Sequence, residues 1–161
     1  MPSIQQFILG EFRRTLDERY RLTIPSEIGD PLTAESLDCF LAKERPGCLS
    51  LWNAATWRAR LDEGVALIEQ KMRAGKLEGR IADVQRLGRL LSTRHAPVQL
   101  AGRGRLLIPE GFRPFLGVEP GGEVMVVGAA VCVEIWRPDA WIAYLDRGIP
   151  KFRRLFDQLS Q

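Results

Sequence analysis

Two closely spaced pairs of arginines are the strongest chemical feature of this sequence. Arg19 and Arg21 flank one residue in a short polar segment, and Arg103 and Arg105 flank one residue in another. The planar guanidinium group suits phosphate oxygens and guanine edges better than the ammonium group of lysine does. Arginine supplies 19 of the 23 basic residues, although a codon bias would produce the same excess. The two pairs are therefore candidates for contact with DNA.

An acidic residue near the first pair offers an alternative. Asp17 precedes Arg21 by four positions, so it could hold that arginine in a salt bridge across a tight turn. One arginine of each pair would then serve the stability of its turn. However, an exposed turn does not need such bulky cations for stability. The two roles are also compatible, because an arginine that is already held in place loses less entropy when it binds.

Both pairs lie within a longer duplication. Residues 16–61 recur at residues 100–145 with a constant offset of 84 positions and 13 identities in 46 positions, where unrelated segments would give about three. The matched positions include Cys48 with Cys132 and all four tryptophans. Two copies of this length predict a pseudo-symmetric pair, since solenoid repeats are shorter and more numerous.

Composition argues against several other classes of protein. The net charge of +3 is mild, and no stretch approaches the roughly 20 apolar residues that cross a bilayer. Residues 1–6 lack the pattern of a signal peptide, which predicts a cytosolic protein. The three cysteines form no CxxC pair and His95 is the only histidine, so Cys48 and Cys132 are interpreted as small core residues. We expect no catalytic residue, metal, cofactor or small-molecule substrate.

The spacing of apolar residues predicts the elements that position the arginines. Ile8, Phe12 and Leu16 indicate a strand over 7–16, which a turn joins to a second strand over 22–24 as a β-hairpin. The second copy predicts the same hairpin around residues 98–108. Pro25 and Pro109 then open possible short helices, at 26–28 and 110–116.

Longer elements complete each half. Paired strands are predicted at 37–43 with 48–52, and at 123–127 with 131–136 across a turn at 128–130. Asn53 is a plausible N-cap and Pro138 a plausible first residue of the helices that follow. Amphipathic spacing predicts helices over 54–72 and 77–91, and a break at 148–150 predicts a second helical hairpin near the C-terminus. The predicted units are 7–53, 54–93, 94–137 and 138–161.

Four segments carry a resemblance to a known family. The run from Gly10 to Pro25 and the run from Leu100 to Pro109 resemble the repeated signature of the MraZ family, and the segments 47–52 and 133–136 are similar to its closing strands. The similarity spans nearly the whole chain and includes the duplication. It implies an α+β fold: an internally duplicated, swapped-hairpin, AbrB-like β-barrel core, with each half followed by a helical hairpin.

The resemblance also implies a function. Members of this family are bacterial transcriptional regulators, often repressors, that form ring-like homo-oligomers in the nucleoid-associated part of the cytoplasm. They bind double-stranded DNA at tandem short boxes upstream of cell-division and cell-wall genes. The DNA-binding residues carried over to this chain comprise the four paired arginines and two on the preceding strand: Arg19, Arg21, Arg103, Arg105, Arg13 and Arg14. Asp17 would orient Arg21.

Neither copy keeps the family's Asp-x-x-x-Arg signature, with glycine before the arginine, intact. The first copy has Tyr20 in place of glycine, and the second has Ala101 in place of aspartate. If position 20 needs a left-handed backbone, a tyrosine there costs on the order of 1–2 kcal/mol. Its ring could stack on a sugar or base, but we favour a ring that lies back over the strands. Because Asp17 can still orient Arg21, the first turn is the stronger candidate for DNA contact.

These departures leave a second hypothesis open. An AbrB-like oligomeric interaction module or antitoxin would keep the core and the helices while its DNA binding is weakened or lost. An enzyme is the third class. It is disfavoured because the chain has no G-x-S-x-G or Walker phosphate-loop motif and only one histidine.

Overall fold

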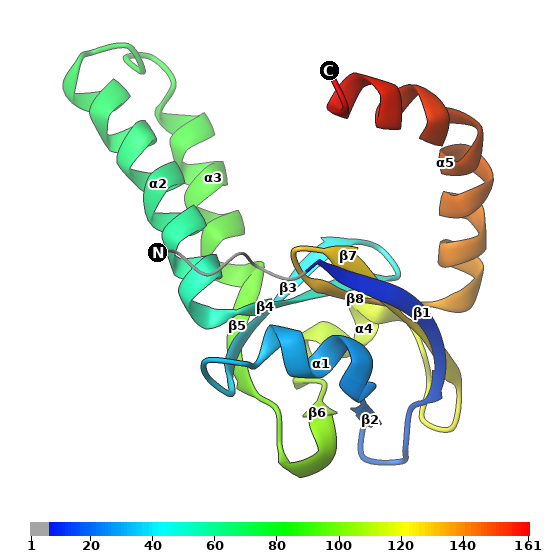
Figure 1. The fold of residues 1–161 in the computed structure, drawn as a ribbon. Helices are drawn as coiled ribbons and strands as arrows, with labels where there is room; N and C mark the ends of the chain where they lie inside the picture. Colours follow the sequence, from blue (N-terminus) through cyan, green and yellow to red (C-terminus); the bar gives the residue numbers. More distant parts are fainter. Residues whose placement is uncertain (1–6) are drawn as a thin grey trace.

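The computed structural model describes residues 7–161, so the expectation drawn from Met1–Gln6 lies outside the described residues. The fold is mixed α+β, as the sequence predicts (Figure 1). The first half contains β1 (Ile8–Thr15), β2 (Arg21–Thr23), α1 (Ser26–Leu32), β3 (Asp38–Arg45), β4 (Cys48–Asn53), α2 (Ala54–Arg73) and α3 (Ile81–Thr93). The second contains β5 (His95–Gln99), η1 (Gly102–Gly104), β6 (Arg105–Leu107), η2 (Glu110–Phe112), α4 (Arg113–Leu116), β7 (Glu123–Ala130), β8 (Val133–Trp136) and α5 (Pro138–Leu159).

The order of elements repeats with the offset of the sequence. Moving β2 by 84 positions places it on β6, and the same shift places α1 on the range that η2 and α4 cover together. The first residue of α2, Ala54, falls on Pro138, the first residue of α5. The repeat in the sequence is therefore also a repeat of local structure.

The two halves exchange strands in one antiparallel sheet. The strand order is β1-β7-β8-β4-β3-β5, so β1 of the first half pairs with β7 of the second, and β5 of the second pairs with β3 of the first. The pair β4–β8 joins the halves at the centre. A separate two-stranded ribbon consists of β2 and β6. Each half thus pairs two of its own strands, β3 with β4 or β7 with β8, and its third strand takes its partner from the other half.

The predicted closed barrel is wrong. Within residues 7–161, β1 and β5 are the two outer strands of an open six-stranded sheet and do not pair with each other. The reason lies where each outer strand ends. The chain turns there and continues into β2 or β6, which leave the sheet and pair as a ribbon of three residues from each half.

One face of the sheet packs on the short helices and forms the main core. Leu49 and Ile135, on the central strands, are fully buried, as are Ile28 of α1 and Leu16 at the end of β1. Burying such a side chain contributes about 1.5–3 kcal/mol. The predicted apolar face of β1 is confirmed, with Ile8 and Leu16 buried and Phe12 half-buried. This core fixes the points from which the two arginine-bearing turns leave the sheet.

Two predicted turns differ from the structure. Residues 128–130 belong to β7 and pair with residues 8–10 of β1, so the turn to β8 falls at Val131–Cys132. Gly128 serves a close approach of two strands, because a Cβ there would lie 2.5 Å from the carbonyl oxygen of Ile8. The predicted hairpin ladder of β1 with β2 is also absent from the described pairs, since each strand takes its partner from the other half.

The helices confirm one predicted hairpin and correct the other. Helices α2 and α3 form the first, and the Oδ1 of Asn53 caps α2 by accepting the N–H of Ala55 at 3.0 Å. The second predicted hairpin is wrong, because α5 runs without interruption from Pro138 to Leu159. Pro150 removes one helical hydrogen bond, and the helix bends but continues (Figure 1). Within residues 7–161 we find no helix with the length and apolar character that crossing a membrane requires.

Candidate nucleic-acid interface

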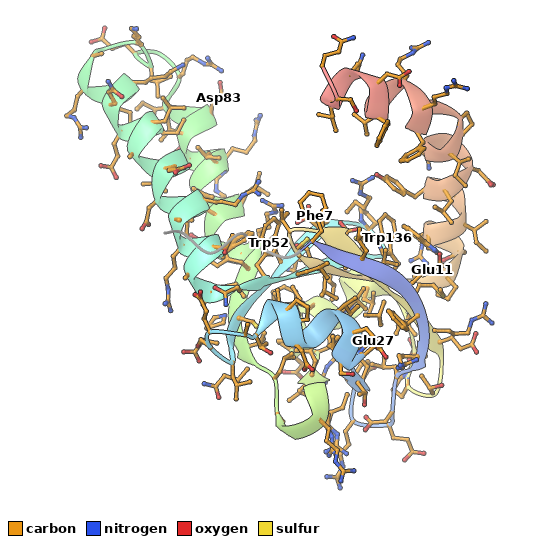
Figure 2. All side chains as sticks on the ribbon, in the orientation of Figure 1. Phe7, Glu11, Glu27, Trp52, Asp83 and Trp136 are labelled. Carbon is orange, nitrogen blue, oxygen red and sulfur yellow. The ribbon has the colours of Figure 1, made fainter. Side chains whose placement is uncertain are left out.

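The two arginine-bearing turns lie side by side at one end of the molecule. We call residues 17–21 the first tip and residues 101–105 the second tip. Pairing of β2 with β6 holds the tips next to each other, because Arg21 lies opposite Leu107 and Thr23 opposite Arg105. Both tips point away from the long helices α2, α3 and α5 (Figure 1), and nitrogen-bearing side chains gather at their ends (Figure 2).

The ribbon gives Arg21 and Arg105 a common outer face. Leu22 and Leu106 point inward and are buried, whereas Arg105 is exposed and Arg21 is partly exposed. Residues two apart on a strand share a face, so the two arginines are diagonal neighbours across the two strands. Diagonal neighbours lie within reach of long side chains. The exchange of strands between the halves therefore brings together two arginines that are 84 positions apart.

Asp17 organises the first tip. Its Oδ1 accepts the backbone N–H groups of Arg19 at 2.8 Å and Arg21 at 2.9 Å, and its Oδ2 accepts the Nε–H of Arg21 at 3.0 Å. The backbone N–H of Arg21 is the main cause that holds the pKa of this carboxyl below its ordinary value, and the N–H of Arg19 and the side chain of Arg21 add to it. The salt bridge suggested by the spacing is thus present.

Tyr20 adopts the left-handed conformation that the family's glycine suggests, with φ of 60°. Its ring packs against the core and beneath the guanidinium of Arg113, 4.2 Å from the ring centroid. The Nε of Arg113 donates to the carbonyl of Ile108 at 2.9 Å. The ring therefore lies back against the protein, as we favoured, and joins the first tip to the second half.

Arg113 is a residue of this site that the sequence alone did not reveal, although a signal was present. Its counterpart 84 positions earlier is Gly29, and the counterpart of Tyr20 is Gly104. The contact between Tyr20 and Arg113 is thus replaced by two glycines at the equivalent place. Both residues of the contact are large where their counterparts in the repeat are glycines. This paired difference could have revealed the contact.

The second tip has the same backbone turn without its carboxylate. The N–H of Ala101 donates to the carbonyl of Arg105 at 2.8 Å, as that of Asp17 does to Arg21 at 2.9 Å. Arg103 and Gly104 both have positive φ, of 65° and 74°. Among the residues described, the side chains of Arg103, Arg105 and Arg19 make no hydrogen bond or ion pair with the protein. These three guanidinium groups are available to a ligand.

The remaining two predicted site residues lie on β1. Arg13 pairs with Glu123 on the neighbouring strand, with Nη1 and Oε2 3.5 Å apart. The guanidinium of Arg14 lies over the ring of Phe12, 5.7 Å from its centroid. The structure thus brings the two tips with their four arginines together and places Arg13 and Arg14 outside the tips, on the outer strand β1 of the six-stranded sheet. Residues 7–161 contain no group of three or more His, Cys, Asp or Glu side chains that could hold a metal ion.

Two surface hollows border the long helices, and a smaller one lies between α2 and the strands β3 and β5. One of them, of about 610 Å³, lies between α2 and α3 and is lined by Trp52, Trp57 and apolar residues of both helices. Trp52 and Trp136 lie near the bases of the long helices (Figure 2), where each packs against a tryptophan of α2 or α5. The arginines of the tips line none of these three hollows. They form a basic end that suits a polymer better than a small molecule.

The fold and the tips define a small α+β protein with two interleaved halves and one basic end. Comparison with known proteins finds relatives that share one name. The family model described as "MraZ protein, putative antitoxin-like" matches residues 95–155. A protein of Syntrophomonas wolfei named transcriptional regulator MraZ is 28% identical over 94% of this chain and 95% of its own. The regulators of the same name from Clostridium beijerinckii and Limosilactobacillus reuteri are each 26% identical, over 95% of this chain and 94% and 97% of their own. The chain is therefore similar to proteins named MraZ over nearly its whole length, and to the MraZ family model over its second half.

Proposed function

We propose that this chain is a transcriptional regulator that binds double-stranded DNA through its two tips. The observation that carries the proposal is the common outer face of Arg21 and Arg105 on the ribbon of β2 and β6. A two-stranded ribbon has dimensions that a major groove admits, and arginine recognises both phosphates and guanine edges there. The names of the relatives agree with this role.

We further infer that the halves are AbrB-like units. In this scheme residues 7–53 and 94–137 are the two units, and residues 54–93 and 138–161 are helical additions. The exchange of β1 and β5 between the halves supports this division, because it interleaves the units as a swapped dimer would. A single chain would then contain the equivalent of an AbrB-like dimer.

Assembly into a ring is part of the proposal. Helix α5 exposes Phe152, Leu155 and Phe156 on one side, and the hollow between α2 and α3 is largely apolar. Exposed apolar surfaces of this kind typically mark protein interfaces. In a ring, contact of one subunit with DNA makes each later contact intramolecular, so tandem boxes are bound with avidity. Boxes about 10 bp apart would present the same groove face to successive subunits.

The site of action would be a promoter in the bacterial nucleoid, within the cytoplasm. The family resemblance points to promoters of cell-division and cell-wall genes. A bound ring would repress transcription by blocking access of the polymerase. Nothing in this role requires a catalytic residue or a cofactor.

A gel-shift experiment tests the proposal. A fragment with tandem boxes, recovered by selection from a random duplex library, is compared with a fragment that has one box. We expect tighter binding to the tandem fragment and a steep loss of affinity as salt rises, because displaced counterions drive association with phosphates. Equal affinity for both fragments would remove the avidity argument. A chain that enriches no duplex would overturn DNA binding itself.

A second candidate is an oligomeric interaction module or antitoxin with weakened DNA binding. Two observations favour it. The matching family model is described as antitoxin-like, and the second tip has Ala101 where the first has the carboxylate of Asp17. This candidate predicts capture of a protein partner together with weak, sequence-independent association with DNA. The salt titration and a pull-down with the whole chain separate the two functions.

A further inference from the structure

The two tips differ in charge and in order although they share a backbone turn. The first tip carries the carboxylates of Asp17 and Glu18 beside its two arginines, so its formal charges cancel. The second tip carries Arg103 and Arg105 and no acidic residue. Attraction to phosphates is a Coulombic effect that grows with net positive charge. The second tip is therefore the one that a phosphate backbone attracts.

Arg21 of the first tip is held in place by the protein, which suits it to recognise a base. Asp17 fixes both the backbone and the Nε of Arg21. The Nη1 and Nη2 groups of Arg21 are left without a partner among residues 7–161. The end of the guanidinium therefore remains available for two parallel hydrogen bonds. Guanine offers two acceptors, O6 and N7, that match this geometry in the major groove.

A second contact holds the first tip against the body of the molecule. Tyr20 lies beneath Arg113, 4.2 Å from ring centroid to guanidinium carbon, and Arg113 is itself fixed by the carbonyl of Ile108. At the equivalent place in the second tip Gly104 has no side chain to make such a contact. A bidentate contact with a base edge depends on the geometry of the side chain, so a tip that is held in place suits it, whereas contacts with phosphate carry no sequence information.

We propose that the tips divide the work: Arg21 reads a guanine while Arg103 and Arg105 hold phosphates, so that each subunit binds an asymmetric DNA element in one orientation. This inference rests on the proposed DNA binding and deepens it. It predicts that the internal symmetry of the fold is not reproduced in the DNA sequence that the chain prefers.

The test compares lysine variants of matched arginines. Lysine keeps the charge but loses the fork of two parallel donors. The probes are a duplex selected by the wild-type chain from a random library and a scrambled duplex of the same length and composition. The measured quantity is the ratio of the dissociation constants for the scrambled and the selected duplex. Arg21→Lys should lower this ratio by about five- to a hundredfold, and Arg105→Lys should change it less than about twofold, since a point charge suffices for a phosphate.

Alanine variants, and a variant in which the carboxylate is moved from the first tip to the second, complete the test. Arg105→Ala should weaken binding to both duplexes by a similar factor and lower the salt slope by about one. Exchanging the carboxylate with Asp17→Ala and Ala101→Asp should transfer the sensitivity, so that in this background Arg105→Lys lowers the ratio and Arg21→Lys no longer does. Arg89→Ala, at an exposed position of α3, is the control for loss of charge.

The outcomes are distinguishable. If the wild-type chain prefers its selected duplex but both lysine variants lower the ratio equally, the division of work is wrong and DNA binding stands. If Arg105→Lys alone lowers it, the assignment of the tips is also wrong. If the wild-type chain selects no duplex, the proposed function fails and this inference fails with it. Melting temperatures of all variants exclude loss of the fold as a cause.

Discussion

The backbone N–H of Ile108 donates a hydrogen bond to the carbonyl of Tyr20 at 2.8 Å. Its counterpart in the other half joins the N–H of Ile24 to the carbonyl of Gly104, also at 2.8 Å. Each tip is therefore anchored to the strand end of the opposite half. Both anchoring carbonyls belong to residues with positive φ, of 60° and 74°. The left-handed turn is needed for this anchor in both tips, whatever side chain occupies the position.

Substitution of Gly104 should therefore destabilise the fold. A Cβ at this position would lie 2.5 Å from the carbonyl oxygen of Ile24, and the backbone is already in the left-handed region. We expect Gly104→Ala to lower the free energy of unfolding by about 2 kcal/mol or more, from strain and overpacking together. Urea denaturation measures this loss.

Gly102 provides the matched control for that measurement. It lies in the same tip, and a Cβ there would meet no atom within 4 Å. Gly102→Ala should change the free energy of unfolding by no more than about 0.5 kcal/mol. A loss of equal size in both variants would contradict the role assigned to the contact between Gly104 and Ile24.

The salt bridge of the first tip should give stability a dependence on pH at the acid end. Hydrogen bonds from Arg21 and Arg19 place the pKa of Asp17 below its ordinary value of 3.8. A carboxylate with a lowered pKa stabilises the folded state at pH values above its unfolded pKa, and this contribution disappears as pH falls through the folded pKa. Asp17→Asn should be less stable than the wild type at neutral pH, and the two should converge as pH falls below 3.8.

Asp17→Ala separates charge from hydrogen bonding in that experiment. Alanine removes the ion pair and also the acceptor of two backbone N–H groups. This variant should stay less stable than the wild type even at acid pH, where the asparagine variant no longer differs. Chemical denaturation across the pH range gives both comparisons. Convergence of both variants with the wild type would mean that the hydrogen bonds of this side chain contribute nothing.

The buried thiols should be unreactive in the folded chain. Burial raises the pKa of Cys39 to about 11 and that of Cys132 to about 12, and it raises the pKa of Cys48 as well. A thiol reacts as its thiolate, so Ellman's reagent at mild alkaline pH should label the native protein slowly and all three cysteines promptly after denaturation. Ser160→Cys, at an exposed position, is a control that should react at once. Prompt labelling of a native cysteine would contradict the core role of these residues.

The sequence was sufficient to predict the parts of the fold that depend on local pattern and on the repeat. Strand and helix positions in the first half, the cap at Asn53 and the salt bridge of Asp17 with Arg21 are examples. Each depends on residues close together in the chain, or on residues that the constant offset relates. Most of the wrong predictions concern features that depend on residues far apart in the chain. Gly128 looks like a turn residue, but its lack of a side chain serves an approach of β1 that no local pattern contains.

Most of the remaining differences between prediction and structure arise because strands pair between the two halves rather than within one half. Hydrophobic spacing predicts a strand but not the strand it pairs with, so a local hairpin was expected where β1 and β2 each pair with the other half. The same limit applies to the contact of Tyr20 with Arg113, which joins two departures from the repeat. Pro150 marks a bend rather than an end of α5, because a proline removes one helical hydrogen bond but its neighbours can continue the helix.

The exposed stripe on α5 should determine the state of assembly. Phe152, Phe156 and Leu159 lie on one side of the helix at spacings of four and three, and each is more than half exposed. A charged group in a buried apolar interface is strongly disfavoured, so Phe156→Glu should dissociate the assembly proposed for this chain. Sedimentation velocity or light scattering after size exclusion measures the mass of the particle.

Gln158→Glu adds the same charge two positions away, on the opposite side of the helix, and should leave the mass unchanged. If Phe156→Glu also keeps the wild-type mass, α5 does not form the subunit contact. If it reduces the mass and also reduces the preference for tandem over single boxes, the assembly and the avidity have one common origin in this helix.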